Sequence, residues 1–306
     1  MRVFRGYSSP VPSPTVLAIG NFDGVHRGHA ALVSRLVETA GRLGLPPTVL
    51  TFEPHPREFF APESAPARLT TLREKIELLA ECGASQAMVC RFDAGFAALS
   101  ARDFIDRVLI GGLQVRHLII GDDFRFGSRR QGDFALLQAV GGERGFAVEA
   151  MASVVADGER VSSSGVREAL AAGDMARAAK LLGRPYVIDG RVVHGDKIGR
   201  QIGFNTANIR IKHNPLPMAG VFAVEVGGLG ERPWPGVANL GIRPTLGGTR
   251  PLLEVHLFDF ARDIYGAHLS VRFVHKLRDE QRFPNFDALK AQIARDAAAA
   301  RAYFKL

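Results

Sequence analysis

The chain has 306 residues and a formal net charge of +8. That length exceeds what one typical core needs and fits two domains of roughly 100–200 residues each. With 46% hydrophobic and 23% charged residues, the composition excludes a largely disordered protein. No apolar stretch approaches the roughly 18 residues of a membrane span, and the N-terminus lacks the apolar core of a secretory signal, so we expect a cytoplasmic protein without a membrane partner.

The basic excess favours an anionic partner, but the basic side chains are scattered along the chain without a block or an aromatic-interleaved stripe. Phosphate-bearing metabolites are therefore favoured over nucleic acid. The two cysteines, Cys82 and Cys90, occur without a Cys-x-x-Cys pattern or clustered histidines. This spacing predicts reduced, buried thiols and no cysteine metal site.

Apolar β-rich runs alternate with helical patterns as far as about residue 183. We expect buried strands at Thr15–Gly20, Pro47–Phe52, Ala87–Phe92 and His117–Gly121. Helices are expected between them at His29–Leu43, Leu72–Cys82, Ala101–Leu109 and Phe134–Glu143. This alternation predicts an α/β domain with a doubly wound, parallel, Rossmann-like sheet, whose ligands gather beyond the carboxyl ends of the strands.

A glycine-rich turn, Gly20–His29 (GNFDGVHRGH), joins the first expected strand to the first expected helix. Its two histidines, His26 and His29, are three positions apart at the start of the helix, where the free N–H groups and the helix dipole favour anions. The glycines would let the backbone approach a ligand closely. The same residues also fit two surface histidines on an ordinary turn, but the position after the first strand favours phosphate binding.

This turn resembles the HxGH nucleotidyltransferase superfamily, and its fuller Gly-Asn-Phe-Asp-Gly-Val-His run is similar to the FMN adenylyltransferase branch. Three further segments resemble that branch: Thr51–Pro56 (TFEPHP), Gly121–Gly127 (GDDFRFG) and Ser162–Arg167 (SSSGVR). Ser164 stands where the family usually has threonine, and it retains the hydroxyl.

The resemblance implies that a phosphate oxygen of FMN attacks the α-phosphate of ATP in line. It implies catalytic roles for His26, His29 and Arg167. Contacts with nucleotide or phosphate are expected from Gly20, Phe22, Gly24, Gly28, Ser163 and Ser164. Contacts with flavin are expected from His55, Asp123 and Phe126. Core packing of Phe126, capping by the serine run and a turn role for Asp23 remain open as simpler interpretations.

Two consecutive helices are expected within Ser162–Gly183, after which the pattern changes to short strands separated by turns. These strands are Tyr186–Val193, Gly220–Val226, Gly236–Gly241, Leu252–Phe260 and Leu269–Val274. They predict an antiparallel β-barrel, followed by a helix at Phe286–Phe304 whose residues Leu289, Ile293 and Ala297 would pack against it. The expected domains are residues 1–183 and 184–306.

The segment Gly190–Asn208 resembles riboflavin kinase, in which a glycine-rich flap precedes a Pro-Thr-Ala-Asn motif. The resemblance implies nucleotide contacts from Gly195, Gly199 and Arg200. It implies Mg²⁺ ligation by Thr206 and Asn208, whose alternation places them on one face of an extended segment. Glu254 would be the general base. A polar stripe on an ordinary strand, or an acid facing solvent, is the alternative.

One residue departs from the kinase pattern. Asn205 occupies the place of the motif's proline, so the fixed φ before Thr206 is absent. We therefore expect a weakened or retuned kinase site.

The motifs follow the order seen in bacterial bifunctional riboflavin kinase/FAD synthetases. The resemblance implies that the chain phosphorylates riboflavin to FMN and adenylylates FMN to FAD with release of pyrophosphate, using ATP as co-substrate and Mg²⁺ as cofactor. The alternatives are an HxGH nucleotidyltransferase for another phosphorylated metabolite and a non-catalytic flavin- or nucleotide-binding protein. We expect a monomer or a weak homo-oligomer.

Overall fold

The computed structural model describes residues 1–194, 204–213, 215–245 and 248–306. Their contacts divide the chain into two compact units, one of Met1–Pro66 with Leu72–Val161 and the other of Ala67–Thr71 with Ser162–Leu306. The two helices after residue 162 thus belong to the second unit by their contacts, while the expected domain boundary at residue 183 stays a prediction. Among the described residues, no helix is long and apolar enough to cross a membrane.

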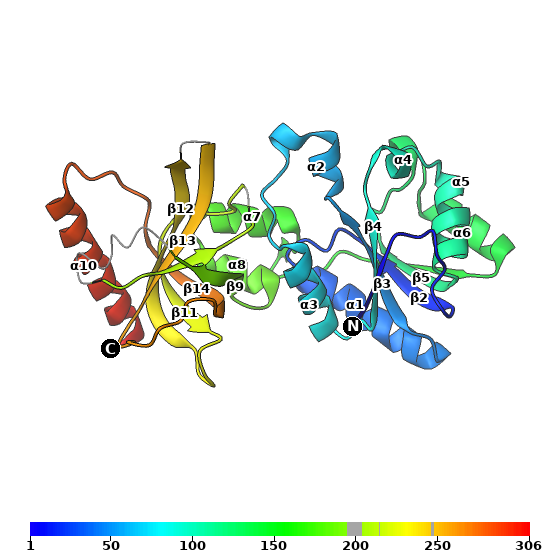
Figure 1. The fold of residues 1–306 in the computed structure, drawn as a ribbon. Coiled ribbons are helices and arrows are strands. Elements are labelled where there is room, and N and C mark those ends of the chain that lie inside the picture. Colours follow the sequence, from blue (N-terminus) through cyan, green and yellow to red (C-terminus); the bar gives the residue numbers. More distant parts are fainter. Residues whose placement is uncertain (195–203, 214, 246–247) are drawn as a thin grey trace. The chain divides into compact units, whose positions relative to one another are not determined.

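The first unit contains the expected parallel sheet, with six strands in the order β1-β4-β3-β2-β5-β6 (Figure 1). The strands are β1 (Arg2–Arg5), β2 (Thr15–Ile19), β3 (Pro47–Glu53), β4 (Gln86–Arg91), β5 (Val115–Gly121) and β6 (Ala147–Met151). The four central strands are those predicted. The edge strands β1 and β6 were missed because most of their side chains are exposed or only partly buried, and they therefore lack a continuous apolar run.

Helices cover both faces of this sheet, as Figure 1 shows. On one face, alternate strand residues such as Val16 and Ala18 pack against α1 (Arg27–Leu43) and α3 (Leu72–Glu81). On the other face, residues such as Leu17 pack against η2 (Phe104–Gly112) and α6 (Phe134–Arg144). This arrangement confirms the doubly wound fold.

The shorter elements are α2 (Pro56–Phe60), η1 (Pro62–Ser64), α4 (Ala94–Ala97), α5 (Ala101–Asp103), η3 (Ser128–Arg130), β7 (Val155–Ala156) and β8 (Glu159–Arg160).

The helix expected at Ala101–Leu109 differs from the prediction in its hydrogen bonding. Only the short α5 is α-helical, and η2, which continues it to Gly112, is a π-helix. The apolar periodicity that predicted a helix here does not distinguish the two windings, because it records only which side chains are buried.

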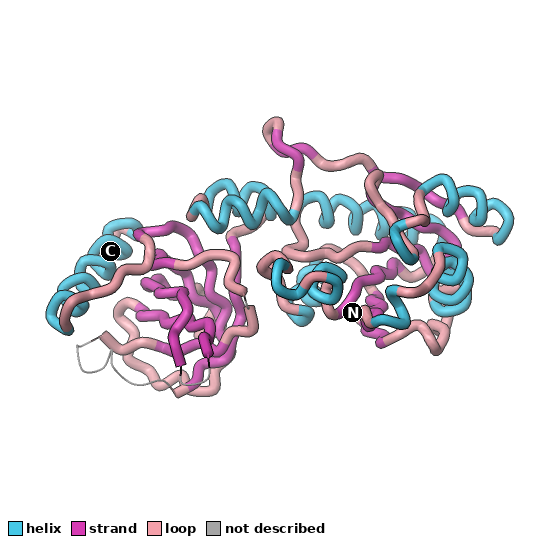
Figure 2. The backbone as a smooth tube through the Cα atoms, turned by 90° about the horizontal axis from the view of Figure 1, so that it is seen from above, coloured by secondary structure: helices cyan, strands magenta, loops and turns pink. Residues whose placement is uncertain are grey.

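The second unit begins with α7 (Ser163–Ala172) and α8 (Met175–Leu182) and continues into a closed antiparallel barrel of order β10-β13-β12-β11-β14-β9. Its strands are β9 (Tyr186–Val193), β10 (Ala207–Arg210), β11 (Gly220–Gly227), β12 (Trp234–Thr245), β13 (Gly248–Leu257) and β14 (His268–Arg278). The barrel confirms the prediction, with β10 added to the five expected strands. The terminal helix α10 (Phe286–Phe304) has the predicted bounds and lies alongside the barrel (Figure 2).

The predicted apolar face of α10 divides into two parts. Ala297 and Ala300, in the second half of the helix, pack against outward-facing barrel residues including Val221. Leu289 and Ile293, in the first half, are only partly buried and line a cavity. The second half of α10 therefore packs directly on the barrel, and its first half leaves a cavity between helix and barrel.

Candidate active sites

The loop between β2 and α1 brings the two predicted histidines together. His26 is the N-cap of α1, and its Nδ1 accepts a hydrogen bond from the backbone N–H of His29 at 3.3 Å, so the ring proton of a neutral His26 lies on Nε2. The two imidazoles stack with centroids 3.7 Å apart. A Cβ at Gly28 would lie 3.2 Å from the His26 ring, so the glycine provides the space that this ring occupies.

The environment of His29 favours its neutral form. Within the described chain, its Nδ1 is buried and has no hydrogen-bond partner, and the ring of Phe22 contacts it edge to face. Burial lowers the pKa of His29 well below its usual value, and the positive charges of His26 and Lys75 lower it further. At neutral pH this imidazole can therefore donate or accept a hydrogen bond but carries no charge. A ligand at this position would satisfy its buried ring nitrogen.

Lys75 is a buried cation beside this site that the sequence analysis did not single out. It lies in α3 with 3% exposure, and its Nζ donates a hydrogen bond of 3.4 Å to Thr51 Oγ1. The Thr51 hydroxyl in turn donates to the backbone oxygen of Asn21, in the histidine loop, at 3.2 Å. Fully buried lysines are rare. The signal available in the sequence was the i,i+4 spacing of Lys75 and Leu79, which places a lysine on the buried face of a helix.

The other predicted residues of this loop are held tightly within the fold. Phe22 is fully buried, and a Cβ at Gly20 would lie 3.2 Å from its ring. Gly24 has a left-handed φ of 81°, which favours glycine. Asp23 is 3% exposed, in keeping with the turn role left open for it. The burial of Phe22 gives it a supporting position behind His29, and its contact with nucleotide stays a prediction.

The predicted flavin-side residues lie in two loops of the first unit, His55 after β3 and both Asp123 and Phe126 after β5. His55 is the N-cap of α2, where its Nδ1 accepts from the backbone N–H of Arg57 at 3.1 Å. Asp123 is exposed and forms an ion pair with Arg160 at 2.8 Å. Phe126 is 6% exposed and lies in the core of the sheet face that η2 covers, which fits the core-packing interpretation. Flavin binding by these three residues stays a prediction.

The serine run and Arg167 lie in the second unit. Ser162 is the N-cap of α7, and its hydroxyl accepts from the backbone N–H of Gly165 at 3.1 Å. Ser163 and Ser164 are the first two residues of that helix, and Arg167 donates from Nε to the backbone oxygen of Ala67 at 2.6 Å. The capping interpretation of the run therefore holds for Ser162. That these residues act on the same nucleotide as the histidines stays a prediction.

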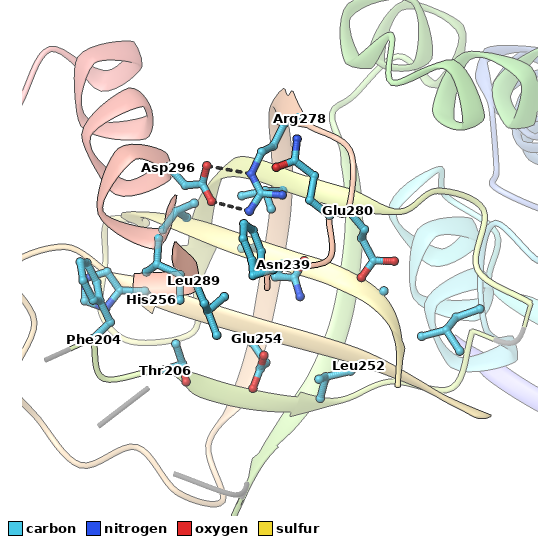
Figure 3. Close-up of a pocket in the computed structure, with 18 residues that line it drawn as sticks. Phe204, Thr206, Asn239, Leu252, Glu254, His256, Arg278, Glu280, Leu289 and Asp296 are labelled. Carbon is cyan, nitrogen blue, oxygen red and sulfur yellow. Dashed lines mark hydrogen bonds and ion pairs between the residues drawn. The ribbon is translucent and has the colours of Figure 1, made fainter. Parts of the chain in front are cut away.

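A cavity of about 370 Å³ lies on the outer face of the barrel beside α10, and Figure 3 shows the side chains that line it. Leu252, Glu254 and His256 of β13 line this cavity, whereas the alternating residues Leu253 and Val255 are buried. The alternation is that of a strand with one face in the barrel interior and one face on the cavity. Predicted residue Glu254 therefore faces a partly open space of ligand size.

Strand register aligns three polar side chains across the cavity face. Glu254 of β13 is directly opposite Asn208 of β10 and also directly opposite Asn239 of β12. Residues directly opposite in a sheet lie on the same face. Thr206, two positions before Asn208, lines the same cavity. The structure thus brings together the predicted residues Thr206, Asn208 and Glu254, and adds Asn239, which the sequence analysis had not identified as a site residue.

Asn205, which stands in the place of the motif's proline, contributes its backbone to this site. Its carbonyl oxygen lies 2.8 Å from Nδ1 of His256, and because a carbonyl can only accept, the imidazole donates. This contact does not require a proline or an asparagine side chain. Gly195, Gly199 and Arg200 lie outside the described residues, so their predicted nucleotide contacts stay predictions.

The side-chain oxygens near this cavity are of the kind that magnesium prefers, and Mg²⁺ ligation by Thr206 and Asn208 stays a prediction. Among the described residues, no cluster of three or more His, Cys, Asp or Glu side chains could hold a metal by itself. Thr206, Asn208 and Glu254 nevertheless offer a hydroxyl, an amide and a carboxylate oxygen. Mg²⁺ prefers oxygen ligands, usually keeps several waters and is often shared between one or two protein groups and substrate phosphates.

Comparison with known proteins identifies the family. A family model described as FAD synthetase matches residues 8–165, and one described as riboflavin kinase matches residues 182–304. The chain is 53% identical to the bifunctional riboflavin kinase/FMN adenylyltransferase of Escherichia coli K12, over 100% of this chain and 99% of that protein. The chain belongs to the bifunctional riboflavin kinase/FMN adenylyltransferase family. This membership confirms the predicted family.

A second family member and one solved structure also match nearly the whole chain. The bifunctional riboflavin kinase/FMN adenylyltransferase of Pseudomonas fluorescens is 51% identical over 99% of this chain and 97% of its own length. A crystal structure described as a macrolide-efflux protein from Streptococcus pneumoniae matches with a TM-score of 0.85 and 28% identity, covering 98% of this chain and 99% of that one. The fold is thus shared with that solved structure over nearly the whole chain.

Proposed function

We propose that the barrel unit transfers the γ-phosphate of ATP to riboflavin, and that the histidine site transfers the adenylyl group of a second ATP to FMN, giving FAD and pyrophosphate. The observation that carries the proposal is the position of Glu254 in a ligand-sized cavity, beside Asn208 and Thr206, in a chain of this family. A carboxylate at the wall of such a cavity can accept a proton from a bound hydroxyl.

In the kinase reaction, Glu254 takes the proton of the ribityl 5′-hydroxyl as that oxygen attacks the γ-phosphorus of ATP and the bond to the β,γ-bridging oxygen breaks. The side chains of Thr206 and Asn208 would hold Mg²⁺, which neutralises charge on the phosphates when it is bound. The apolar side chains of Leu252 and Leu289 provide a surface for the flavin ring. ADP and FMN are the products.

In the adenylyl transfer, a phosphate oxygen of FMN attacks the α-phosphorus of ATP and pyrophosphate leaves. His29 acts here as a neutral N–H donor, in keeping with its lowered pKa, and His26 can donate from Nε2. Arg167 and the hydroxyls of Ser163 and Ser164 would add charge and hydrogen bonds on the phosphates. This contribution is mainly positioning and electrostatic stabilisation.

The remaining parts of the proposal concern the setting of the enzyme. We propose a cytoplasmic protein, a monomer or weak homo-oligomer, that binds no nucleic acid. The scattered basic residues support the last point. The two family matches, one to each part of the chain, support flavin nucleotides as substrates in preference to another phosphorylated metabolite or a non-catalytic binding role.

Incubation of the purified chain with riboflavin, ATP and Mg²⁺, followed by chromatography of the flavins, tests this function. Glu254→Gln should lower FMN formation roughly 10²- to 10⁴-fold and leave FAD formation from added FMN intact. His29→Ala should do the reverse. Each variant should keep the activity of the unchanged site, and that activity shows that the variant is folded. A wild-type chain that makes neither product, or a folded variant that loses both activities, would contradict the proposal.

A further inference from the structure

Asn239 of β12 lies beside the proposed catalytic base without an assigned role. It is directly opposite Glu254 in the strand register, and both side chains line the cavity. Figure 3 draws both side chains at the cavity, with no hydrogen bond between them. Asn208 is opposite Glu254 on its other side. The carboxylate is therefore flanked by two amides across three adjacent strands.

The surroundings on β12 and β11 are apolar, which makes an amide at this position unusual. Val237 precedes Asn239 by two residues on the same face, and Val221 is directly opposite Asn239 on β11. Both valines line the cavity. Packing alone would be satisfied by another aliphatic side chain here. Asn239 is only partly buried and its side chain makes no hydrogen bond among the described residues, so its amide is available to a group in the cavity.

The distance across the strands suits a contact between the two side chains. Residues directly opposite in an antiparallel pair have Cβ atoms about 4.5–5.5 Å apart, a span that an asparagine and a glutamate side chain can bridge with one N–H···O hydrogen bond. The amide of Asn239 has two N–H donors, and an ionised carboxylate only accepts. A hydrogen bond to a charged group is also among the stronger ones in proteins.

We propose that Asn239 is a positioning residue of the riboflavin kinase reaction: with riboflavin bound, its amide donates a hydrogen bond to the carboxylate of Glu254 and holds it toward the attacking hydroxyl. The inference rests on the proposed role of Glu254 as base. The two flanking amides then have different roles, because Asn208 serves the metal and phosphates whereas Asn239 serves the carboxylate. Asn239 itself neither gains nor loses a proton in the reaction.

Substitution of Asn239 separates this role from simple packing. Asn239→Leu keeps a similar volume on an apolar surface and removes the donor, so we expect kcat for FMN formation to fall roughly 10-fold. KM for riboflavin and the half-saturating concentrations of ATP and Mg²⁺ should stay near wild type. Asn239→Ser retains a short donor and should recover part of kcat. FAD formation from added FMN should be unchanged in both variants.

The decisive measurement is a double-mutant cycle with Glu254. Because Asn239 is expected to act only through that carboxylate, Asn239→Leu should have no further effect on kcat in the Glu254→Gln background. Equal fold losses in both backgrounds, or an Asn239→Leu variant with wild-type kcat, would overturn the inference. So would a change confined to the Mg²⁺ or ATP half-saturation. If Glu254→Gln itself retained full kinase activity, the proposed function of Glu254 would fail instead.

Discussion

The ion pair between Arg278 and Asp296 joins β14 to α10 at one wall of the cavity beside that helix. Arg278 donates from Nε at 2.9 Å and from a terminal nitrogen at 2.6 Å to the two oxygens of Asp296 (Figure 3). Gln292 adds a third hydrogen bond at 2.8 Å. The Asp296 side chain is only 8% exposed and that of Arg278 17%. Such burial limits the ability of water to replace a lost partner.

Asp296→Asn tests how strongly this pair holds the helix. The substitution keeps the shape of the side chain and removes its charge, which leaves a largely buried guanidinium with only neutral acceptors, the new amide oxygen and the backbone oxygen of Asp279. Hydrogen bonds to charged groups contribute about 1.5–3 kcal/mol each, so we expect the free energy of unfolding of the barrel unit to fall by about 2–3 kcal/mol. With an m-value near 2 kcal/mol/M, the urea midpoint should fall by about 1–1.5 M.

The chain provides its own probe and its own control for this measurement. Trp234, the single tryptophan, lies on β12, so its fluorescence reports unfolding of the barrel unit. Asp259→Asn removes the acid of a second ion pair of α10, with Arg301, but this aspartate is 71% exposed. Exposed pairs contribute little, so the midpoint should move far less. Equal shifts for the two variants, or no shift for Asp296→Asn, would refute the argument from burial.

Two further predictions concern the histidine site. Gly28→Ala should displace the His26 ring by a few tenths of an ångström, since the new Cβ would lie 3.2 Å from that ring. We therefore expect FAD formation to fall roughly 10-fold, with FMN formation as the control activity. Unchanged FAD formation would count against this expectation. Lys75→Met removes a positive charge that depresses the pKa of His29, so the NMR titration midpoint of His29 should move to higher pH. A midpoint that stays in place or moves to lower pH would contradict this.

Local patterns in the sequence determined the elements and the family. Continuous apolar runs predicted the four central strands of the sheet, and the helical period predicted α10 to the residue. The glycine-rich turn placed His26 and His29 at the start of a helix, where the structure has them. These features depend on neighbours within a few residues, so one-dimensional periodicity and motif spacing were sufficient. The edge strands lacked such a pattern and were missed.

The tertiary structure decided which of these residues meet and in what environment. Asn239 and Glu254 are 15 positions apart in the numbering, and only the register of β12 and β13 makes them opposite. Lys75 of α3 reaches the histidine loop through Thr51 of β3. The pKa of His29 depends on burial by elements that are distant in sequence. Pairing register and desolvation arise from contacts between distant segments, and no local pattern encodes them.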